Sequence, residues 1–282
     1  MAVLRVNGLT KYFGINSVFE NVSFELKSGE HIGLVGANGA GKTTLLKCIM
    51  GREEADRGTI KTSDGAVIGY LRQDFDYAGE TIRDEMEEAW EDVLFYKDRM
   101  ERLAAELEFH KDDADLVLEY GKTEARFEFL GGYDYESATK KILTGLGFTE
   151  EDWDRDIHSF SGGQKVRINL AAAFVRHPDF LLLDEPTNHL DMGMLEWLED
   201  YLRSYKGGVL MISHDRYFLD AAATGIIDLE NHRIHSYRGG YTRYMDTKTR
   251  ETAAYEKAYE KQQEHIRETE EYIRSEEHTS EL

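Results

Sequence analysis

The chain has 282 residues, of which 41% are hydrophobic, so it can bury the core of one large domain. Its net charge of −21 argues against a broad, sequence-independent affinity for nucleic acid or for an anionic membrane. The single cysteine, Cys48, excludes an internal disulfide and fits a reducing compartment. No run approaches the ~20 apolar residues that span a bilayer, and no long apolar stretch follows Met1. We therefore expect a soluble, cytoplasmic protein without membrane insertion.

The N-terminal part of the chain favours short strands. Apolar and polar residues alternate in several stretches, as they do in strands with one buried face. A turn that carries Tyr12 and Phe13 is expected over 10–14, and a helix over 44–50. The predicted strands cover 3–6, 22–26, 32–35, 58–61 and 66–71.

Between the strand at 32–35 and the helix that follows it, the sequence Gly-Ala-Asn-Gly-Ala-Gly-Lys-Thr fits the phosphate-binding pattern G-x-x-x-x-G-K-[ST]. The glycines let the backbone aim successive N–H groups at a phosphate. Lys42 adds a charge for the β and γ phosphates, and the Thr43 hydroxyl can ligate Mg²⁺. The alternative, a glycine-rich turn with a coincidental lysine, is disfavoured by the strand and the helix on either side. The residues expected to bind nucleotide here are Gly36, Asn38, Gly39, Ala40, Gly41, Lys42, Thr43 and Thr44.

The middle of the chain changes to a helical period. From Thr81 to Leu107, apolar residues recur at steps of three and four, which predicts one long amphipathic helix. A polar break at 110–115 precedes a second helical segment, so we expect a helical hairpin inserted over 81–130. Residues 80–130 hold seven Lys and Arg against seventeen Asp and Glu. The simpler interpretation of that charge is a face of the hairpin that is exposed to solvent. An acidic hairpin is also a poor candidate for binding RNA.

The second half of the chain alternates helices with apolar strands. Acidic residues and a histidine follow the strands directly, which predicts a mostly parallel α/β sheet with a ligand at its carboxyl edge. A last charged helix over 249–274 has the apolar spacing of a two-helix coiled coil. Helices are predicted over 138–146, 165–176 and 194–205, and strands over 180–183, 208–212 and near Ile226 and Ile234.

Two strand ends supply candidate catalytic groups. Asp184 suits Mg²⁺ coordination through water, and Glu185 suits polarising an attacking water molecule. His214 follows the next buried strand and could donate to a γ-phosphate, while Gln73 could sense that phosphate from the base of the insert. For His214 and Gln73 taken alone, ordinary loop residues are the simpler interpretation.

A second anion site is predicted at the start of another helix. Ser161, Gly162, Gly163 and Gln164 offer a hydroxyl and unhindered backbone N–H groups at a helix N-terminus. Because the first phosphate site is already accounted for, the second implies a nucleotide that is bound by a partner.

In order and spacing, these motifs resemble the full set of an ATP-binding cassette ATPase, over about Val3 to Arg274. The resemblance implies the α/β fold of a P-loop NTPase, with a mixed sheet core, a helical subdomain and a C-terminal coiled-coil-like helix. It implies that ATP is hydrolysed with Mg²⁺ held at Thr43, Gln73 and Asp184. It further implies a head-to-tail pair of cassettes around two ATP molecules, with residues 161–164 contributed by the second cassette.

The resemblance also implies an aromatic side chain that stacks on adenine. Phe13 fits this role best, and Tyr12 is the alternative; core packing remains open for either ring.

Residues 184–191, Asp-Glu-Pro-Thr-Asn-His-Leu-Asp, resemble the F subfamily of soluble ribosome-associated ATPases, whose hallmark is the Asn-His pair. This resemblance implies a cassette over 1–240 and the first helix of an interdomain linker over 241–273, which reaches toward transfer RNA on the ribosome. One alternative is the nucleotide-binding subunit of a membrane transporter, which the Asn-His pair and the last helix disfavour. Another is a regulatory cassette without turnover, against which the intact Lys42 and Glu185 argue.

The last residues of the chain, 274–282, match the translation of a sequencing-adapter oligonucleotide. We expect them to be non-native, and we expect the natural chain to be longer.

Overall fold

The computed structural model describes residues 2–71, 77, 79–110 and 113–280. The strands are β1 (Val3–Phe13), β2 (Asn16–Lys27), β3 (His31–Val35), β4 (Arg57–Thr62), β5 (Ile68–Leu71), β6 (Phe180–Asp184), β7 (Gly208–Ile212), β8 (Gly225–Glu230) and β9 (Arg233–Arg238). The helices are α1 (Lys42–Ile49), α2 (Ile82–Ala89), α3 (Glu91–Phe109), α4 (Ala114–Phe129), α5 (Tyr135–Gly145), α6 (Gly162–Phe174), α7 (Met192–Ser204), α8 (Arg216–Ala222) and α9 (Tyr241–Ser280).

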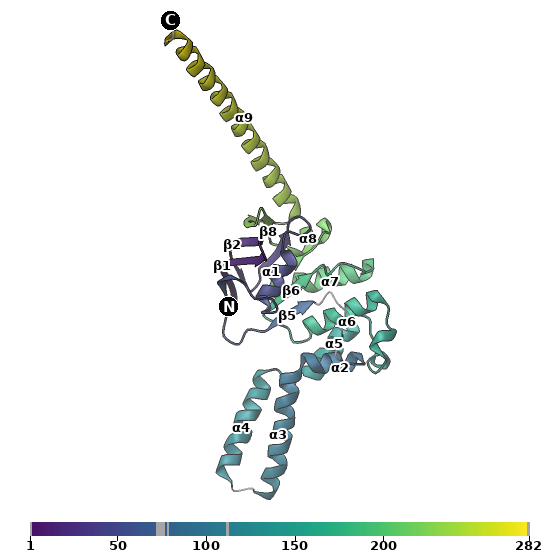
Figure 1. Ribbon diagram of the computed structural model, residues 1–282. Coiled ribbons are helices and arrows are strands. Elements are labelled where there is room, and N and C mark those ends of the chain that lie inside the picture. The colour runs from purple at the N-terminus through teal and green to yellow at the C-terminus, as the bar shows by residue number, and fades with distance from the viewer. Residues whose placement is uncertain (1, 72–76, 78, 111–112, 281–282) are drawn as a thin grey trace.

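Two sheets form the centre of the fold. The larger has six strands in the order β5-β6-β7-β3-β8-β9, and all of its neighbours pair in parallel except β8 and β9. The smaller is antiparallel, in the order β2-β1-β4. The predicted mostly parallel α/β sheet is therefore confirmed. In Figure 1 the α3–α4 hairpin and α9 project from opposite ends of this body.

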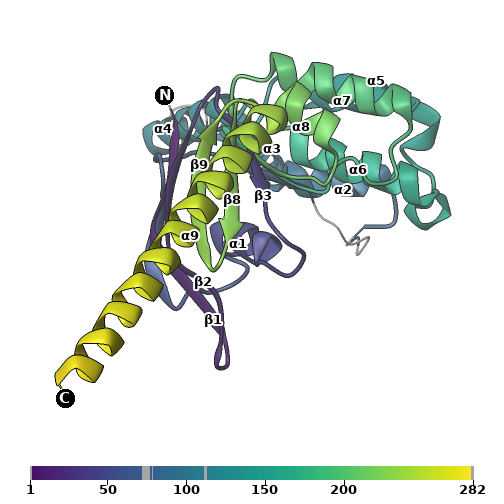
Figure 2. The same ribbon diagram turned by 90° about the horizontal axis from the view of Figure 1, so that it is seen from above.

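The two faces of the large sheet pack against different partners. Along β6, Phe180 and Leu182 join a core with β1, β2 and α1, whereas Leu181 and Leu183 join a core with α5 to α8. This alternation follows from the two-residue period of a strand. Every residue of β6 and of β7 is buried, as expected for parallel strands that are covered on both faces. Figure 2 shows α9 passing over β8 and β9 on its way out of the body.

The predicted turn over 10–14 is wrong, because β1 continues to Phe13. Tyr12 pairs with Ser17 and Phe13 with Asn16 on β2. The turn itself is formed by Gly14 and Ile15, directly after β1 ends. The φ of Gly14, +62°, suits a residue without a Cβ. The two aromatic rings therefore lie at a strand end.

The predicted single helix from Thr81 to Leu107 is also wrong, since the structure divides it into α2 and α3 at Trp90. The backbone of Trp90 leaves the helical region, with φ −106° and ψ +17°. Its side chain is buried, and the indole N–H donates to the Thr139 hydroxyl over 3.0 Å. A contact with α5 thus fixes Trp90 at the expense of helical continuity.

The last helix begins earlier than the predicted 249. Asp220 of α8 accepts hydrogen bonds from the backbone N–H and the hydroxyl of Thr242, which places the start of α9 at Tyr241. The division into domains at 240 and the non-native tail stay predictions. Among the described residues, none of the helices combines the length and the apolar character that crossing a membrane requires.

Candidate nucleotide-binding site

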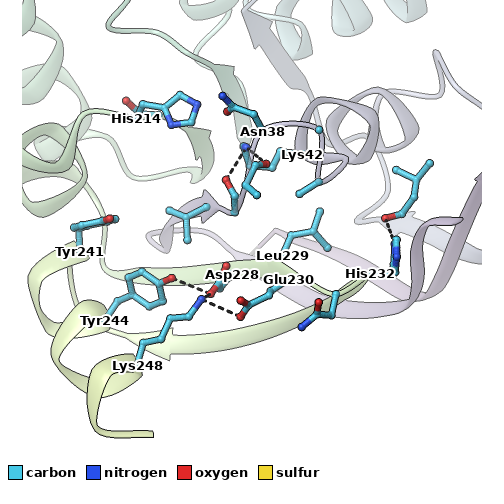
Figure 3. Close-up of a pocket in the computed structure, with 18 of the residues that line it drawn as sticks. Asn38, Lys42, His214, Asp228, Leu229, Glu230, His232, Tyr241, Tyr244 and Lys248 are labelled. Carbon is cyan, nitrogen blue, oxygen red and sulfur yellow. Dashed lines mark hydrogen bonds and ion pairs between the residues drawn. The ribbon is translucent and has the colours of Figure 1, made fainter. Parts of the chain in front are cut away.

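A cleft of about 640 Å³ surrounds the predicted phosphate-binding loop at the carboxyl edge of the large sheet (Figure 3). The parallel register sets this edge, because Val35 of β3 lies opposite Asp228 of β8. The loop contributes Gly36, Ala37, Asn38, Gly39, Ala40 and Lys42 to the lining. Thr43 and Thr44 follow in the first turn of α1.

The backbone of the loop leaves no room for a side chain at its first glycine. Gly36 has φ +149°, and a Cβ at this position would lie 2.5 Å from the Leu229 carbonyl oxygen. The Lys42 ammonium folds back over the loop and donates to the carbonyl oxygens of Gly36, at 2.9 Å, and Ala37, at 3.0 Å. No side chain caps the N-terminus of α1, and its first turn holds no acid. The positive end of the helix dipole is thus open to an anion.

Asp184 fits the predicted metal role. Its side chain is only 2% exposed, and neither carboxylate oxygen has a hydrogen-bond partner within the described part of the chain. Burial raises the pKa of Asp184, while the Thr43 hydroxyl and the Lys42 charge act in the opposite direction. An unsatisfied buried carboxylate is costly, and Mg²⁺ with its water shell would supply the missing partners.

The described residues offer no ready-made metal site of acids and histidines. The described residues contain no group of three or more His, Cys, Asp or Glu side chains arranged to bind a metal. Mg²⁺ would therefore rely on the Thr43 hydroxyl, on Asp184 and on phosphate oxygens. Gln73, the third predicted ligand, lies outside the described residues.

Glu185 and His214 are brought together by the pairing of β6 with β7. The Glu185 carboxylate accepts from the His214 backbone N–H over 3.3 Å, and its other oxygen lies 3.4 Å from His214 Nε2. Glu185 has φ +51°, an uncommon value for a residue with a side chain, and its backbone N–H donates to the Ile212 carbonyl. The glutamate side chain is 15% exposed and His214 is 63% exposed. A partly screened carboxylate can thus act beside an accessible imidazole.

Ser161 to Gln164 are not among the described residues that line this cleft. Thr43, Asp184 and Glu185 do not line it either, but Thr43 follows Lys42 in the chain, and Glu185 contacts His214, which does line it. Ser161 caps α6: its hydroxyl accepts from the Gln164 backbone N–H, and the Gln164 side chain accepts from the Ser161 backbone N–H over 2.9 Å. Ser161 and Gly162 are exposed. The motif is available to another surface.

The two candidate adenine-stacking rings are not core residues. Phe13 is 51% exposed and Tyr12 is 37% exposed, so the core-packing alternative is wrong for both. The Lys11 ammonium lies 5.1 Å from the centroid of the Phe13 ring. The choice between the two rings stays a prediction.

The cleft has a second wall that sequence reasoning missed. Arg216 of α8, His232 of the β8–β9 turn, and Tyr241, Tyr244 and Lys248 of α9 line it. None of them belongs to a phosphate-binding pattern. The only signal in the sequence is the spacing of Tyr241, Tyr244 and Lys248, which places the three on one face of a helix.

Comparisons with known proteins identify the family. A family model described as ABC transporter matches residues 19–188, and a second model with the same description matches 227–280. The protein named ABC transporter F family member 5 from Arabidopsis thaliana is 36% identical over 276 residues, which cover 96% of this chain and 40% of that protein. The energy-dependent translational throttle protein EttA from Mycobacterium tuberculosis (strain ATCC 25618 / H37Rv) is 32% identical over 266 residues, which cover 94% and 47%.

A solved structure titled "Structure of ATP binding subunit of ABC transporter" has a TM-score of 0.64 at 23% identity, covering 84% of this chain and 90% of that one. It shows the same fold. The chain spans less than half the length of the two relatives described above. The predicted family is confirmed: the chain belongs to the ABC transporter family, as an ATP-binding cassette whose relatives include members of the F subfamily.

Proposed function

We propose that this cassette binds ATP with Mg²⁺ in the cleft and hydrolyses it together with a second cassette. One observation carries the proposal: the uncapped phosphate loop, the unsatisfied Asp184 carboxylate and the Glu185–His214 pair meet at one edge of the sheet. Binding alone would not require a glutamate beside the metal ligand. A carboxylate in that place suits the activation of water.

Each side chain has a role in this proposal. Lys42 and the N-terminus of α1 stabilise the phosphate charge, and Thr43 and Asp184 hold the metal. The ion, when bound, neutralises charge on the transferred phosphoryl group. Glu185 takes the proton of the attacking water, and His214 orients the terminal phosphate through its exposed imidazole.

The second cassette supplies Ser161 to Gln164. None of these four residues is among the described residues that line this chain's own cleft, and Ser161 and Gly162 are exposed, which supports a site completed across an interface. The net charge of −21 opposes the association of like chains, which makes a homodimer weak.

The concentration dependence of hydrolysis tests this arrangement. A monomer is expected to bind nucleotide and turn it over slowly, and the rate per molecule should rise with concentration because the active species is a dimer. ATPase activity is measured across a hundredfold range of protein concentration. A flat and fast specific activity would mean that one cassette suffices.

We further propose that the protein acts on the ribosome in the cytoplasm, with α9 reaching toward transfer RNA. The relatives support this proposal, since one of them is named a translational throttle protein. In α9, residues 241–267 hold six Lys and Arg against five Asp and Glu, whereas the α3–α4 hairpin is strongly acidic. Of the two projections, α9 is thus the better suited to lie near RNA.

Co-sedimentation with ribosomes tests this second proposal. The Glu185→Gln variant, which should retain ATP, is expected to pellet with ribosomes in ATP and to stay in the supernatant in ADP. Lys42→Ala is the matched control that should not pellet in either nucleotide. Equal recovery of Glu185→Gln in ATP and in ADP would contradict the proposal.

A further inference from the structure

The first turns of α9 contact the end of β8 at the side of the cleft (Figure 3). The Tyr244 hydroxyl donates to the Asp228 carboxylate over 2.8 Å. The Lys248 ammonium lies 2.5 Å from the same carboxylate and 2.9 Å from that of Glu230. Asp228 is 2% exposed and Tyr244 is 4% exposed, so the contact between them is an interior one, whereas Glu230 is exposed. Two side chains of α9 thus hold two side chains of β8.

The residue between the two carboxylates touches the phosphate loop. Leu229 lies between Asp228 and Glu230, and its carbonyl oxygen is the atom that a Cβ on Gly36 would meet at 2.5 Å. Gly36 opens the loop directly after Val35, which pairs with Asp228. The backbone of β8 is therefore the floor of the loop, and α9 fixes that floor on both sides of the contact.

The Lys248 ammonium keeps its charge under ordinary assay conditions. Burial acts to lower the pKa of Lys248, but its bonds to Asp228 and Glu230 outweigh that effect and raise the pKa. The ammonium therefore stays charged at neutral pH. Among the described side chains, removing it would leave the Tyr244 hydroxyl as the one donor to the buried Asp228 carboxylate, and an uncompensated buried charge is strongly unfavourable.

We propose that Tyr244 and Lys248 are positioning residues for the phosphate loop, and that they couple the orientation of α9 to the nucleotide in the cleft. The inference rests on the proposed binding of ATP. Coupling between two sites is reciprocal. If the contacts of α9 with β8 change the affinity of the loop for nucleotide, bound nucleotide must in turn change the preferred orientation of α9. A bound phosphate that shifts Gly36 presses on Leu229, and the anchor transmits this displacement to the base of a helix that leaves the body (Figure 1).

The test uses three variants of the full chain. Lys248→Gln removes the charge, and Tyr244→Phe removes only the hydroxyl. Glu251→Gln is the matched control, because it neutralises the α9 carboxylate that accepts from the Tyr237 hydroxyl of β9 over 3.0 Å, away from the cleft. Spin labels at Asp64→Cys and Lys257→Cys report the distance from the body to α9, since both positions are exposed and Cys48 is buried.

Two readouts separate positioning from a merely structural role. The affinity for a fluorescent ATP analogue should fall about five- to tenfold in Lys248→Gln and less in Tyr244→Phe, a size typical of coupling between sites. The distance between the labels should change on addition of nucleotide in the unaltered protein and in Glu251→Gln. That change should be lost in Lys248→Gln.

Unchanged affinity and an unchanged distance response in both Lys248→Gln and Tyr244→Phe would overturn the inference, while leaving ATP binding intact. An equal effect of Glu251→Gln would overturn it as well. If the unaltered protein bound no nucleotide, the proposed function and the inference would fail together. Should Lys248→Gln not fold, Tyr244→Phe decides, since it conserves the ring and removes a single atom.

Discussion

Two helix N-termini in this cassette have glycines beside them or within their first turn, but they are built in opposite ways. At α1, Gly41 precedes the helix with φ +100°, and no side chain caps the first turn. At α6, Ser161 and Gln164 close a capping box on themselves. The backbone N–H groups at the start of α1 are left for a ligand, whereas at α6 the capping box already satisfies some of these N–H groups.

This difference separates binding from turnover. An anion can enter the loop before α1 by displacing only the Lys42 ammonium from two carbonyl oxygens. At α6, a ligand that draws on the Ser161 hydroxyl must compete with the capping box, which is worth about 1 kcal/mol. We therefore expect nucleotide to bind first to the loop before α1 and to engage Ser161 only when a second cassette closes over it.

The largest expected effect is on chemistry alone. Glu185→Gln should slow hydrolysis by roughly 10²–10⁴-fold, because the base for the attacking water is lost. ATP affinity should stay unchanged, since the loop before α1 is untouched. Steady-state ATPase rates and nucleotide titration check the two halves of this expectation. Glu196→Gln, an exposed position of α7, is the control that should keep normal turnover.

A smaller effect should appear in binding. Lys42→Ala removes charge-assisted hydrogen bonds to phosphate, worth about 1.5–3 kcal/mol, or roughly a ten- to hundredfold loss of affinity. Lys47→Ala, in the last turn of the same helix, is the control for the general loss of positive charge. Titration with a fluorescent ATP analogue compares them. The same dissociation constant for both variants would refute the assignment of the loop.

The base end of the nucleotide should contribute less. Phe13→Ala is expected to weaken binding by about 1–3 kcal/mol, the range for stacking on an aromatic side chain. Tyr12→Ala should cost less, although its ring is also partly exposed. A cost for Tyr12→Ala that equals or exceeds that for Phe13→Ala would identify the other ring.

The smallest effects are on stability, and they should have opposite signs at Ser161 and at Asp184. Ser161→Ala removes a satisfied cap and should lower the free energy of unfolding by about 1 kcal/mol. Asp184→Asn removes a buried charge whose desolvation outweighs the opposing effects of Thr43 and Lys42, so it should stabilise the nucleotide-free protein.

The pH dependence of unfolding gives the second half of this test. Burial raises the pKa of Asp184 in the folded state, so the nucleotide-free fold loses stability as pH rises from the unfolded-state pKa toward the folded one. Asp184→Asn should abolish that loss. Denaturant unfolding at several pH values measures it, and destabilisation by Asp184→Asn at neutral pH would contradict this account of the empty site.

Local patterns were sufficient to predict the phosphate-binding side of the cleft. The phosphate loop, Asp184 and Glu185 are each recognisable from a few neighbouring residues, whereas His214 is identified only by its spacing from the other motifs. Parallel pairing then places the strand ends at one edge. The two wrong elements depend on distant contacts. Trp90 interrupts a helical pattern because of Thr139, and β1 extends to Phe13 because β2 pairs with it.

The wall formed by α9 was unpredictable for the same reason. Tyr244 and Lys248 reach the cleft because β8 turns back through β9 into α9, and no spacing in the sequence specifies that path.

The central claim is that this chain carries the two halves of an ATPase site that faces another cassette. Mixing two inactive variants tests it most directly. Lys42→Ala retains Ser161, and Ser161→Ala retains the phosphate loop, so a mixed dimer would contain one intact site. We predict that the mixture hydrolyses ATP faster than the sum of the two variants measured separately at the same total concentration. A rate equal to that sum would show that Ser161 is not used across an interface, and would contradict the account.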